Sequence, residues 1–460
     1  MSLHANWSDK RVLLLGFGAE GRSNLLYAAK CGAREIAIAD QASSVTVPSD
    51  DAHLITRVFS GVDWLAGLYD YDIIIRSPGV PLRHLSNLPQ AAPQTVVTSG
   101  TDIFLGQHRD RTIGITGTKG KSTTTSLIYH ILTRANIAAQ LGGNIGIPAL
   151  NLLDTRAAVY VLELSSYQLA DVRTSPHIAV LLNLYPEHLD HHGSFELYGA
   201  AKASISRFQT HQDTLVLPSG SEHLQRLTES SSAQRVLWGT PNDQSWIERE
   251  HFYYRCAKGL THKVCSITTP LLKGPGNQRN ILAALAAISH LSLPTDVLAQ
   301  ALASFRPLPH RLEEVAVTSG VTFINDSIST VPEATINALE TFGPLVGTVL
   351  LGGFDRGVSF AKLADYLMQT NVKTILLFPP SGTRIAQALK EHPLFSSNPR
   401  TIIEVSSMQD AVYHARVNTP PGSICLLSPA SPSFPLFKNF EERGAAFRDA
   451  VLSKHTPSEL

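Results

Sequence analysis

Short apolar runs alternate with longer amphipathic stretches over residues 11–103, and this alternation predicts an α/β domain. The runs "RVLLLGFG", "EIAIAD" and "YDIIIRSPGV" have the length and composition of strands, and "NLLYAAKCGA" between the first two has the pattern of a helix. Strands that are apolar almost throughout are typical of parallel sheets covered by helices. We therefore expect an N-terminal domain built on parallel strands.

The same alternation occurs twice more along the chain. "TIGIT" leads into a glycine-rich loop and a helix beginning near Lys121, and the strands "AVYVLELS" and "IAVLLNL" follow. After "FRPLPHRLEEV", where Pro307 and Pro309 interrupt helical periodicity, the strands "GVTFIND", "GTVLLGG", "KTILLF", "TIIEV" and "SICLLSP" alternate with helical stretches. The pattern predicts three α/β domains with mostly parallel sheets, at residues 1–105, 106–307 and 308–460.

Composition agrees with a folded protein and excludes several classes of partner. The chain has 460 residues, 43% apolar and 17% charged, which is typical of about three globular domains. Its 38 basic and 38 acidic residues cancel, so net charge indicates neither nucleic acid nor a membrane surface as a partner. No apolar run is long enough to span a membrane, and the N-terminus does not resemble a signal peptide. Four cysteines without CxxC spacing favour a reduced cytoplasmic protein.

The segment "GITGTKGKSTTT" has the features of a phosphate-binding loop. Gly117 and Gly120 allow backbone N–H groups to approach phosphate oxygens, Lys121 is placed to reach the β- and γ-phosphates, and Ser122 can bind Mg²⁺. Ile115 stands where the full Walker spacing has glycine, so the match is to the shorter G-T-x-G-K-S form. The alternative is a glycine-rich turn with an incidental lysine, but the strand before it and the helix after it favour a nucleotide site.

A second glycine turn, "GFGAEG", follows the first strand and precedes Asp40 by about twenty residues. This is the dinucleotide fingerprint, although the same turn can bind any diphosphate, including a UDP-sugar. The turn could also serve the fold alone, without a ligand.

Carboxylates and histidines follow two strands of the predicted central sheet. Glu163 ends "VYVLE", and "YPEHLDHHG" comes directly after "AVLLNL". Ligands of parallel sheets lie at such carboxyl ends, so Glu163 and His188 are candidate Mg²⁺ ligands. His191 and His192 are expected to belong to a solvated polar loop. Lys202, judged as a lone lysine in "YGAAKASI", is expected to be a surface charge.

Taken together, a series of motifs resembles the Mur ligases in order and spacing, and within them the branch that adds glutamate to UDP-N-acetylmuramoyl-L-alanine. The motifs are "GTKGKS", "GGNIG", "LELSSYQL", "NLYPEHLDHH", "YGAAKASI", "GPGNQRNILAALAA", "LPHRLEEV", "INDS", "LGGFDRG" and "SPASPSFPLFKNFEERG". The resemblance covers essentially the whole chain.

The resemblance implies a Rossmann-like domain for the UDP-sugar, a central ATPase domain and a Rossmann-like C-terminal domain that binds ATP and glutamate. The substrate carboxylate would attack the γ-phosphate of ATP to form an acyl phosphate, and the amine of glutamate would then displace phosphate. Such chemistry depends on alignment and charge neutralisation. ATP and Mg²⁺ are the implied cofactors, and a cytoplasmic monomer in peptidoglycan synthesis is the implied setting.

The resemblance also implies a role for particular residues. The implied ATP contacts are Gly117, Thr118, Lys119, Gly120, Lys121, Ser122, Thr123, Asn277, Asn280, Arg311 and Asp326. The implied Mg²⁺ ligands are Ser122, Glu163, His188 and Lys202, the last as a carbamate formed with CO₂, and the implied catalytic group is Lys121, Asn144, His188 and Lys202. The implied UDP-sugar contacts are Gly16, Gly18, Asp40, Ser77, Gly79, Asn144, Ser165 and Gln168, and the implied glutamate contacts are Thr330, Arg356, Ser433 and Phe440.

Departures from the family pattern concentrate where glutamate is expected. The familiar "NDSKATN" reads "NDSISTV" here, which puts Ile328 in the place of a lysine, and Pro435 replaces the acidic residue of the "SPA" motif. In the phosphate loop the only change is Lys119 for asparagine. If the amine of glutamate keeps its position, inverting the α-carbon changes the direction of the α-carboxylate. The protein groups that bind this carboxylate must then lie elsewhere. The distribution favours L-glutamate as the substrate, with a separate epimerase later producing the D-centre.

Other functions stay open at this point. The first is the same reaction with D-glutamate, in which Arg356 or Lys438 has taken over the role of the missing lysine. The others are an NAD-dependent oxidoreductase that uses the "GFGAEG" turn, an ATP-gated interaction protein, and a folylpolyglutamate-type ligase.

Overall fold

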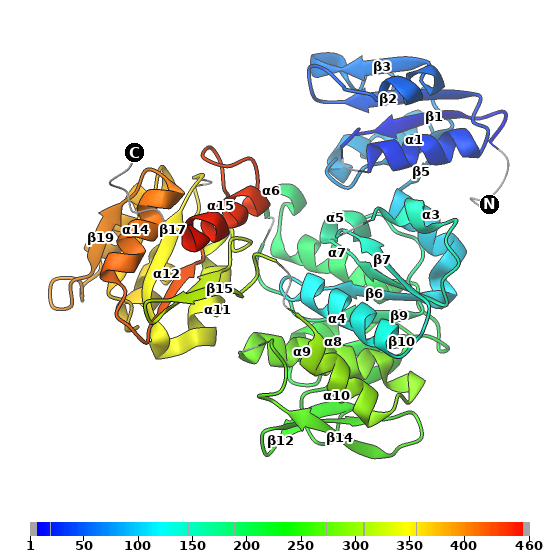
Figure 1. Ribbon diagram of the computed structural model, residues 1–460. Coiled ribbons are helices and arrows are strands. Elements are labelled where there is room, and N and C mark those ends of the chain that lie inside the picture. Colours follow the sequence, from blue (N-terminus) through cyan, green and yellow to red (C-terminus); the bar gives the residue numbers. More distant parts are fainter. Residues whose placement is uncertain are drawn as a thin grey trace. The chain divides into compact units, whose positions relative to one another are not determined.

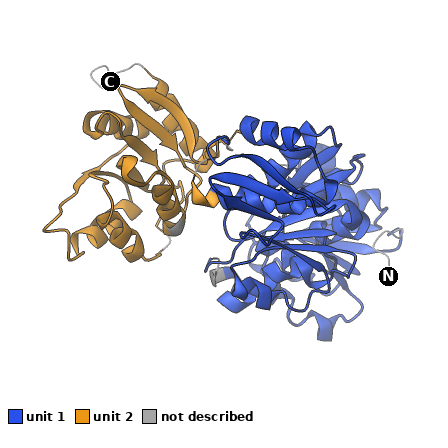
Figure 2. Ribbon diagram, turned by 90° about the horizontal axis from the view of Figure 1, so that it is seen from below, with its two compact units in different colours: residues 1–270, 277–305 blue, residues 271–276, 306–460 orange. Residues whose placement is uncertain are grey.

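The computed structural model describes residues 7–18, 20–145, 147–187, 189–272, 274–306, 309–355 and 357–453, except for the side chains of Leu189, Asp190 and Glu333. The chain forms two compact units, one of residues 1–270 and 277–305 and the other of residues 271–276 and 306–460 (Figure 2). Three sheets are distributed over them, two in the first unit and one in the second (Figure 1). Among the described helices, none is both long and apolar enough to cross a membrane.

The N-terminal sheet has five parallel strands in the order β3-β2-β1-β4-β5. Its strands are β1 (Arg11–Leu15), β2 (Glu35–Asp40), β3 (Arg57–Ser60), β4 (Ile73–Arg76) and β5 (Val96–Thr98), and its helices are α1 (Gly21–Lys30), α2 (Leu88–Ala91) and α3 (Gly100–His108). Apolar clusters form around both faces, one including Leu14 and Ile75 and the other Leu13 and Ile74. The strand order reverses between β1 and β4, so the loops after these two strands diverge and leave room for a ligand.

The central sheet has nine strands in the order β14-β13-β12-β11-β10-β9-β6-β8-β7. The strands are β6 (Thr112–Thr116), β7 (Ala139–Gly143), β8 (Val159–Glu163), β9 (Ile178–Leu181), β10 (Thr214–Pro218), β11 (Gln234–Trp238), β12 (Ser245–Glu248), β13 (His251–Arg255) and β14 (Thr261–Ser266). The helices are α4 (Lys121–Arg134), α5 (Ser166–Leu169), α6 (Leu189–His192), α7 (Phe195–Arg207), α8 (Glu222–Leu227), α9 (Pro275–Ile288) and α10 (Thr295–Ser304). In the sheet order, neighbouring strands from β7 to β12, which include β6, are parallel. The pairs β12–β13 and β13–β14 are antiparallel.

The second unit contains a sheet of six strands in the order β15-β16-β20-β17-β18-β19. The strands are β15 (Glu313–Thr318), β16 (Val321–Asn325), β17 (Val346–Gly352), β18 (Thr374–Phe378), β19 (Thr401–Glu404) and β20 (Ile424–Leu427), and the helices are α11 (Pro332–Phe342), α12 (Ala361–Met368), α13 (Ser381–Lys390), α14 (Met408–Asn418) and α15 (Phe440–Leu452). Only β15 is antiparallel to its neighbour. The loops that follow the adjacent strands β16, β20 and β17 therefore meet at one edge of the sheet.

The predicted fold class, three α/β layers with mostly parallel strands, is confirmed. Each strand predicted from an apolar run is present, and the helix predicted near Lys121 begins at that residue. The sequence did not predict β10 to β14, which extend the central sheet. The domain limits at 105 and 307 stay predictions, and Pro307 lies outside the described residues.

Candidate active site

The phosphate-binding segment lies at the carboxyl end of β6, in the middle of the central sheet. Gly117 has φ of 152° and Gly120, the N-cap of α4, has φ of 84°, a backbone region that other residues rarely adopt. A Cβ at Gly120 would overlap the side-chain oxygen of Asn280 on α9, and one at Gly117 would lie 3.0 Å from Leu182 Cβ. The backbone angles therefore favour glycine at both positions, and at 120 a side chain would also displace Asn280.

Hydrogen bonds to the loop after β9 hold this segment in place. The N–H of Thr118 donates to Asn183 O at 3.1 Å, and the N–H of Lys119 donates to Asn183 Oδ1 at 2.8 Å. The Asn183 amide donates back to Lys119 O at 2.9 Å. The Lys119 amine lies 2.8 Å from Glu187 Oε1, so this extra cation of the loop is balanced by a carboxylate. The loop is organised before any ligand binds.

Lys121 and the residues after it form the first turn of α4. The Lys121 amine donates to Thr118 O at 3.0 Å across the loop. Ser122 and Thr123 are buried with exposed fractions of 8% and 1%. The helix N-terminus, its N–H groups and the lysine cation together form a site suited to an anion.

Glu163, the last residue of β8, presents a buried carboxylate beside this loop. Its exposed fraction is 1%, and Oε1 accepts a hydrogen bond of 2.7 Å from Asn144 Nδ2. The other oxygen, Oε2, is buried without a hydrogen-bond partner in the described part of the chain. A buried carboxylate oxygen without a partner is costly, and a divalent cation would satisfy it. The chemistry of the site therefore fits Mg²⁺.

His188, the other predicted ligand, lies outside the described residues. Among the residues that the structure describes, no three His, Cys, Asp or Glu side chains gather into a metal-binding cluster.

Lys202 is buried, and the expectation of a surface charge from its sequence context is wrong. It lies on α7 with an exposed fraction of 2%, and its amine donates to Gly117 O at 2.8 Å and lies 4.9 Å from the centre of the Tyr198 ring. Burial holds the pKa of this amine well below its ordinary value, and the nearby Lys121 cation lowers it further. The amine therefore has a larger neutral, nucleophilic fraction than an ordinary lysine.

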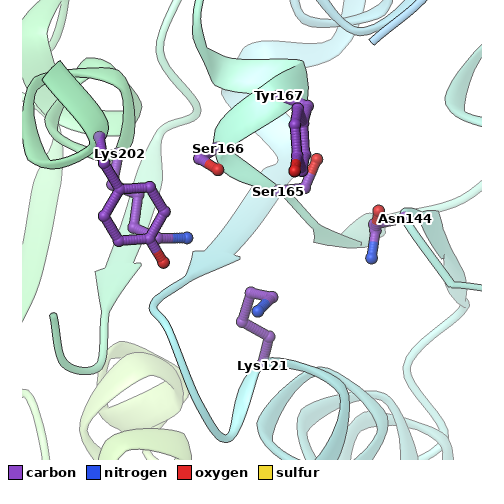
Figure 3. A pocket seen from close by; sticks show the side chains of 7 residues that line it. Lys121, Asn144, Ser165, Ser166, Tyr167 and Lys202 are labelled. Atoms are coloured by element: carbon purple, nitrogen blue, oxygen red, sulfur yellow. The ribbon is translucent and has the colours of Figure 1, made fainter. Parts of the chain in front are cut away.

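A cavity of about 120 Å³ lies between the phosphate loop and α7 (Figure 3). It is lined by Lys121, Asn144, Ser165, Ser166, Tyr167, Tyr198 and Lys202. Figure 3 shows Lys121 approaching from the loop side and Lys202 from α7, with Ser165 and Tyr167 on the wall opposite Lys121. Two lysines and several hydroxyl and amide groups face one small space, which suits a phosphate or carboxylate.

The pair His191 and His192 was expected in a solvated polar loop but lies in the short helix α6, where both side chains are half-buried against this wall. His192 Nε2 lies 3.0 Å from Ser166 Oγ, and its ring lies 5.4 Å from that of Tyr198. The His191 ring meets Tyr167 edge-on at 4.2 Å. These histidines support the hydroxyl groups that line the cavity.

The N-terminal glycine turn lies where β1 and β4 diverge. Gly16 has φ of 86° and its carbonyl accepts a hydrogen bond of 2.7 Å from Ser77 Oγ, so the two loops are joined. A Cβ at Gly18 or Gly79 would meet nothing within 4 Å, which leaves open space at both loops. The carboxylate of Asp40 accepts from the N–H groups of Phe17 and Ala42 at 2.7 and 2.8 Å. Asp40 therefore holds the turn in place through hydrogen bonds to its backbone.

Two residues that the sequence did not single out join this turn to the central sheet. Arg76, fully buried at the end of β4, bonds Asp171 Oδ2 at 2.6 Å and Tyr167 O at 2.8 Å. Glu20 accepts a hydrogen bond of 2.8 Å from Gln168 Nε2. A charged residue directly after three isoleucines in "IIIR" could have indicated a functional or structural role for Arg76. The sequence around Glu20 has no comparable feature.

In the second unit, the loop after β16 is held by a closed polar network. The carboxylate of Asp326 accepts from Ser329 Oγ at 2.5 Å, Ser428 Oγ at 2.8 Å and the N–H of Leu312 at 3.3 Å. Burial raises the pKa of Asp326 to about 6, although these hydrogen bonds and the nearby Arg311 lower it. This loop is a rigid part of the sheet edge.

Arg443, 2% exposed, anchors the same edge from α15. Its guanidinium donates to Ser327 O at 2.8 Å and to Ser431 O at 3.0 Å, and burial lowers its pKa to about 9. It thereby ties the loop after β16 to the loop after β20.

The predicted glutamate residues come from these loops. Thr330 is half-buried, Ser433 is buried, and Phe440 is the half-buried first residue of α15. Arg356 lies outside the described residues. Ile328 is half-buried, and its N–H donates to His310 O at 3.2 Å, whereas Pro435 is exposed.

Residues 115–288 match the family model described as the Mur ligase middle domain. The chain is 35% identical to a protein of Salinispora tropica named UDP-N-acetylmuramoyl-L-alanine--L-glutamate ligase, with 96% of this chain and 97% of the relative covered. It is 34% identical to a protein of Acidobacterium capsulatum named UDP-N-acetylmuramoylalanine--D-glutamate ligase, with 96% of each covered.

Solved structures share the fold at low sequence identity. The Thermotoga maritima protein titled UDP-N-acetylmuramate-alanine ligase MurC superposes with a TM-score of 0.57 at 18% identity, with 95% of this chain and 98% of the other covered. The MurF ligase from the same organism, solved in complex with ADP, superposes with a TM-score of 0.56 at 18% identity, with 97% and 96% covered.

Proposed function

The chain belongs to the Mur ligases, ATP-dependent enzymes that form amide bonds, and we propose that it joins L-glutamate to UDP-N-acetylmuramoyl-L-alanine for peptidoglycan synthesis. The observation that carries the ligase chemistry is the cavity at the phosphate loop, which is lined by Lys121, Lys202 and Asn144, and Asn144 bonds the buried carboxylate of Glu163. Relatives of almost equal similarity are named for L- and for D-glutamate. The choice of L-glutamate therefore rests on the residues of the glutamate loops.

The loop and Lys121 suit the first step, in which a carboxylate oxygen of the acceptor attacks the γ-phosphorus and ADP leaves. Backbone N–H groups at the start of α4 and the Lys121 cation would hold the phosphate oxygens, since transfer depends on aligning them and neutralising their charge. Mg²⁺, when bound, would neutralise phosphate charge, with Glu163, Ser122 and His188 as its proposed ligands. Asn277, Asn280, Arg311 and Asp326 are proposed as further ATP contacts.

In the second step the amine of glutamate attacks the acyl carbon and phosphate leaves with its electron pair. Charge develops on the carbonyl oxygen, so cations and N–H donors around the cavity favour this step. Asn144, which orients Glu163, and Ser165 are the groups proposed to hold the reacting end of the acceptor.

We propose that Lys202 acts as a carbamate. A neutral amine can add to CO₂ and release a proton, which yields an anionic group in place of a cation, and the lowered pKa of Lys202 favours the neutral form. A negative group beside Lys121 would be a suitable oxygen ligand for Mg²⁺.

The sugar nucleotide is proposed to bind at the divergence of β1 and β4. Gly16, Gly18, Ser77 and Gly79 leave the open space for a diphosphate, and Asp40 supports the turn. This space lies in the same unit as the cavity, and Gln168 connects the two. An NAD-dependent oxidoreductase would leave the phosphate loop without a role.

L-glutamate is proposed to bind at Thr330, Arg356, Ser433 and Phe440. Ile328 is the residue that favours the L enantiomer, because an apolar side chain stands where a cation would hold a differently directed carboxylate. The product would then need an epimerase to give a D-centre. The enzyme is proposed to act in the cytoplasm as a monomer.

The test is phosphate release by the pure protein with ATP, Mg²⁺ and UDP-N-acetylmuramoyl-L-alanine, comparing L- with D-glutamate. We expect turnover with L-glutamate and little with D-glutamate. Turnover with D-glutamate only would reject the stereochemical assignment and keep the ligase. Release that does not depend on the muramoyl nucleotide would reject the function as a whole.

A further inference from the structure

Glu20 places an acidic side chain in the glycine turn proposed for a diphosphate. A carboxylate facing that space would repel the ligand, yet this side chain faces the central sheet, where Gln168 Nε2 donates to its Oε1 at 2.8 Å. Burial raises the pKa of the Glu20 carboxyl, while the bond to Gln168 and the Arg76 cation lower it. The carboxylate is therefore directed at Gln168.

Gln168 is held at both ends. Its Oε1 accepts from the N–H of Ser165 at 3.0 Å and from Ser165 Oγ at 3.1 Å, and its Nε2 donates to Glu20. With an exposed fraction of 2%, the amide has little access to water as a substitute partner. Since the oxygen end is committed to Ser165, Glu20 provides the acceptor that the nitrogen end needs.

Ser165 is the point where this chain of hydrogen bonds reaches the reactive cavity. It lines the cavity with Lys121 and Asn144, and it also caps α5 by accepting from the N–H of Gln168 at 3.2 Å. The position of the Ser165 hydroxyl therefore depends on Gln168, and that of Gln168 depends on Glu20.

A separate contact secures the two sheets against each other. The guanidinium of Arg76 donates to the carboxylate of Asp171 and to the carbonyl of Tyr167. The side chains of Arg76 and Asp171 are 0% and 10% exposed, so this ion pair is buried. Because this buried ion pair does not include Glu20, removal of the Glu20 side chain leaves the main connection in place.

We propose that Glu20 is a positioning residue that acts through Gln168 and Ser165, and so couples the sugar-nucleotide turn to the acceptor end of the cavity. This inference rests on the proposed function, in which one ligand extends from the turn to the cavity. It assigns a role in the reaction to a residue outside the cavity lining.

The test measures initial rates of phosphate release by the full-length protein for Glu20→Ala, Glu20→Met, Glu20→Gln, Gln168→Ala and the Glu20→Ala/Gln168→Ala double variant. We expect Glu20→Ala and Glu20→Met to lower kcat with the muramoyl nucleotide by about tenfold, with the KM for ATP unchanged, because a hydrogen bond to a buried amide is lost. Glu20→Gln, which keeps an acceptor oxygen, should stay within about twofold of wild type. The double variant should be no slower than Gln168→Ala, since the two residues act in series.

Glu35→Ala is the matched control, because Glu35 accepts a hydrogen bond from Tyr71 within the N-terminal sheet and has no contact with Gln168. Additive losses in the double variant, or a Glu20→Gln as slow as Glu20→Ala, would overturn the inference. A lower KM for the muramoyl nucleotide in Glu20→Ala, with kcat unchanged, would also overturn it by showing simple repulsion. Absence of turnover by the wild-type protein would instead reject the proposed function.

Discussion

The cavity of the first unit and the loop after β16 in the second unit both contain buried charged groups, but they satisfy them differently. At the cavity, Lys202 is buried with a lowered pKa, and Glu163, which is bonded to the lining residue Asn144, has an Oε2 without a hydrogen-bond partner among the described residues. In the loop, Asp326 has three hydrogen-bond donors and Arg443 binds two carbonyl groups.

The cavity has a buried polar atom beside it that a ligand could satisfy, whereas the polar atoms of Asp326 in the loop already have hydrogen-bond partners within the protein. Polar groups buried without partners cost free energy, and ligand binding can recover it. The network at Asp326 provides hydrogen-bond partners within the fold, although burial still disfavours the charged form of this carboxylate. Ile328 lies between the network residues Ser327 and Ser329. Substitution at 328 can therefore alter the amino-acid pocket while the loop keeps its shape.

The largest effect should come from Lys121→Ala, which tests whether the cavity is the catalytic region. We expect phosphate release to fall about 10³-fold, because a cation that neutralises the transferring phosphate is lost. Thermal stability should change little. Lys30→Ala, which removes a surface ion pair with Asp154 whose lysine side chain is 60% exposed, should keep full activity. Equal rates for the two variants would contradict the role of Lys121.

A smaller effect is expected from Asp326→Asn, which tests whether the loop network is a scaffold. The folded pKa of about 6 is above the ordinary value of 3.8, so the folded state binds this proton more tightly. The contribution of the group to stability is thus present below pH 4 and is lost as the pH rises through about 6, a change of about 3 kcal/mol in the free energy of unfolding. Asp326→Asn should remove that pH dependence in urea unfolding between pH 4 and 7.

Asp355→Asn provides the control for this measurement. The pKa of Asp355 is lowered, first by the backbone N–H of Gly357, so its titration falls below this pH range. The slope between pH 4 and 7 should be unchanged in this variant. The same fall in stability in wild type and Asp326→Asn would contradict the assignment.

The smallest effect is expected from Ile328→Lys, which tests whether the loop sets stereochemistry. We expect the ratio of kcat/KM for L- over D-glutamate to fall by about tenfold, since one new charge contact is worth about 1.4 kcal/mol. Ile328→Leu should keep the ratio of the wild type. If the two variants prefer L-glutamate equally, Ile328 does not select the enantiomer.

The fold could be predicted from apolar runs for most strands that are buried on both faces, although the buried strand β10 was missed. β4, β6 and β17 are buried along their whole length, and each appeared as a continuous run. In contrast, β13 alternates buried with half-buried residues and β14 has a single buried residue, so "HFYYR" and "THKVCS" do not stand out from loop sequences.

The site could be predicted in part for a similar reason. The glycines and Lys121 form a local motif, so the sequence revealed them. The burial of Lys202 depends on its contact with Gly117 in the loop after β6, which is 85 positions away in the sequence, and local composition therefore indicated a surface lysine. Contacts such as that between Glu20 and Gln168 join residues 148 positions apart and leave no local pattern.

The close approach of Gly120 to Asn280 has a consequence for the redesign of this protein. Because the backbone at 120 has a positive φ and a Cβ there would overlap the side-chain oxygen of Asn280, replacement of Gly120 would both strain the loop and displace Asn280. A smaller residue at 280 would relieve only the second of these effects. A redesign of the nucleotide site should therefore keep glycine at 120 and introduce its changes on α9, where the loop backbone sets no such demand.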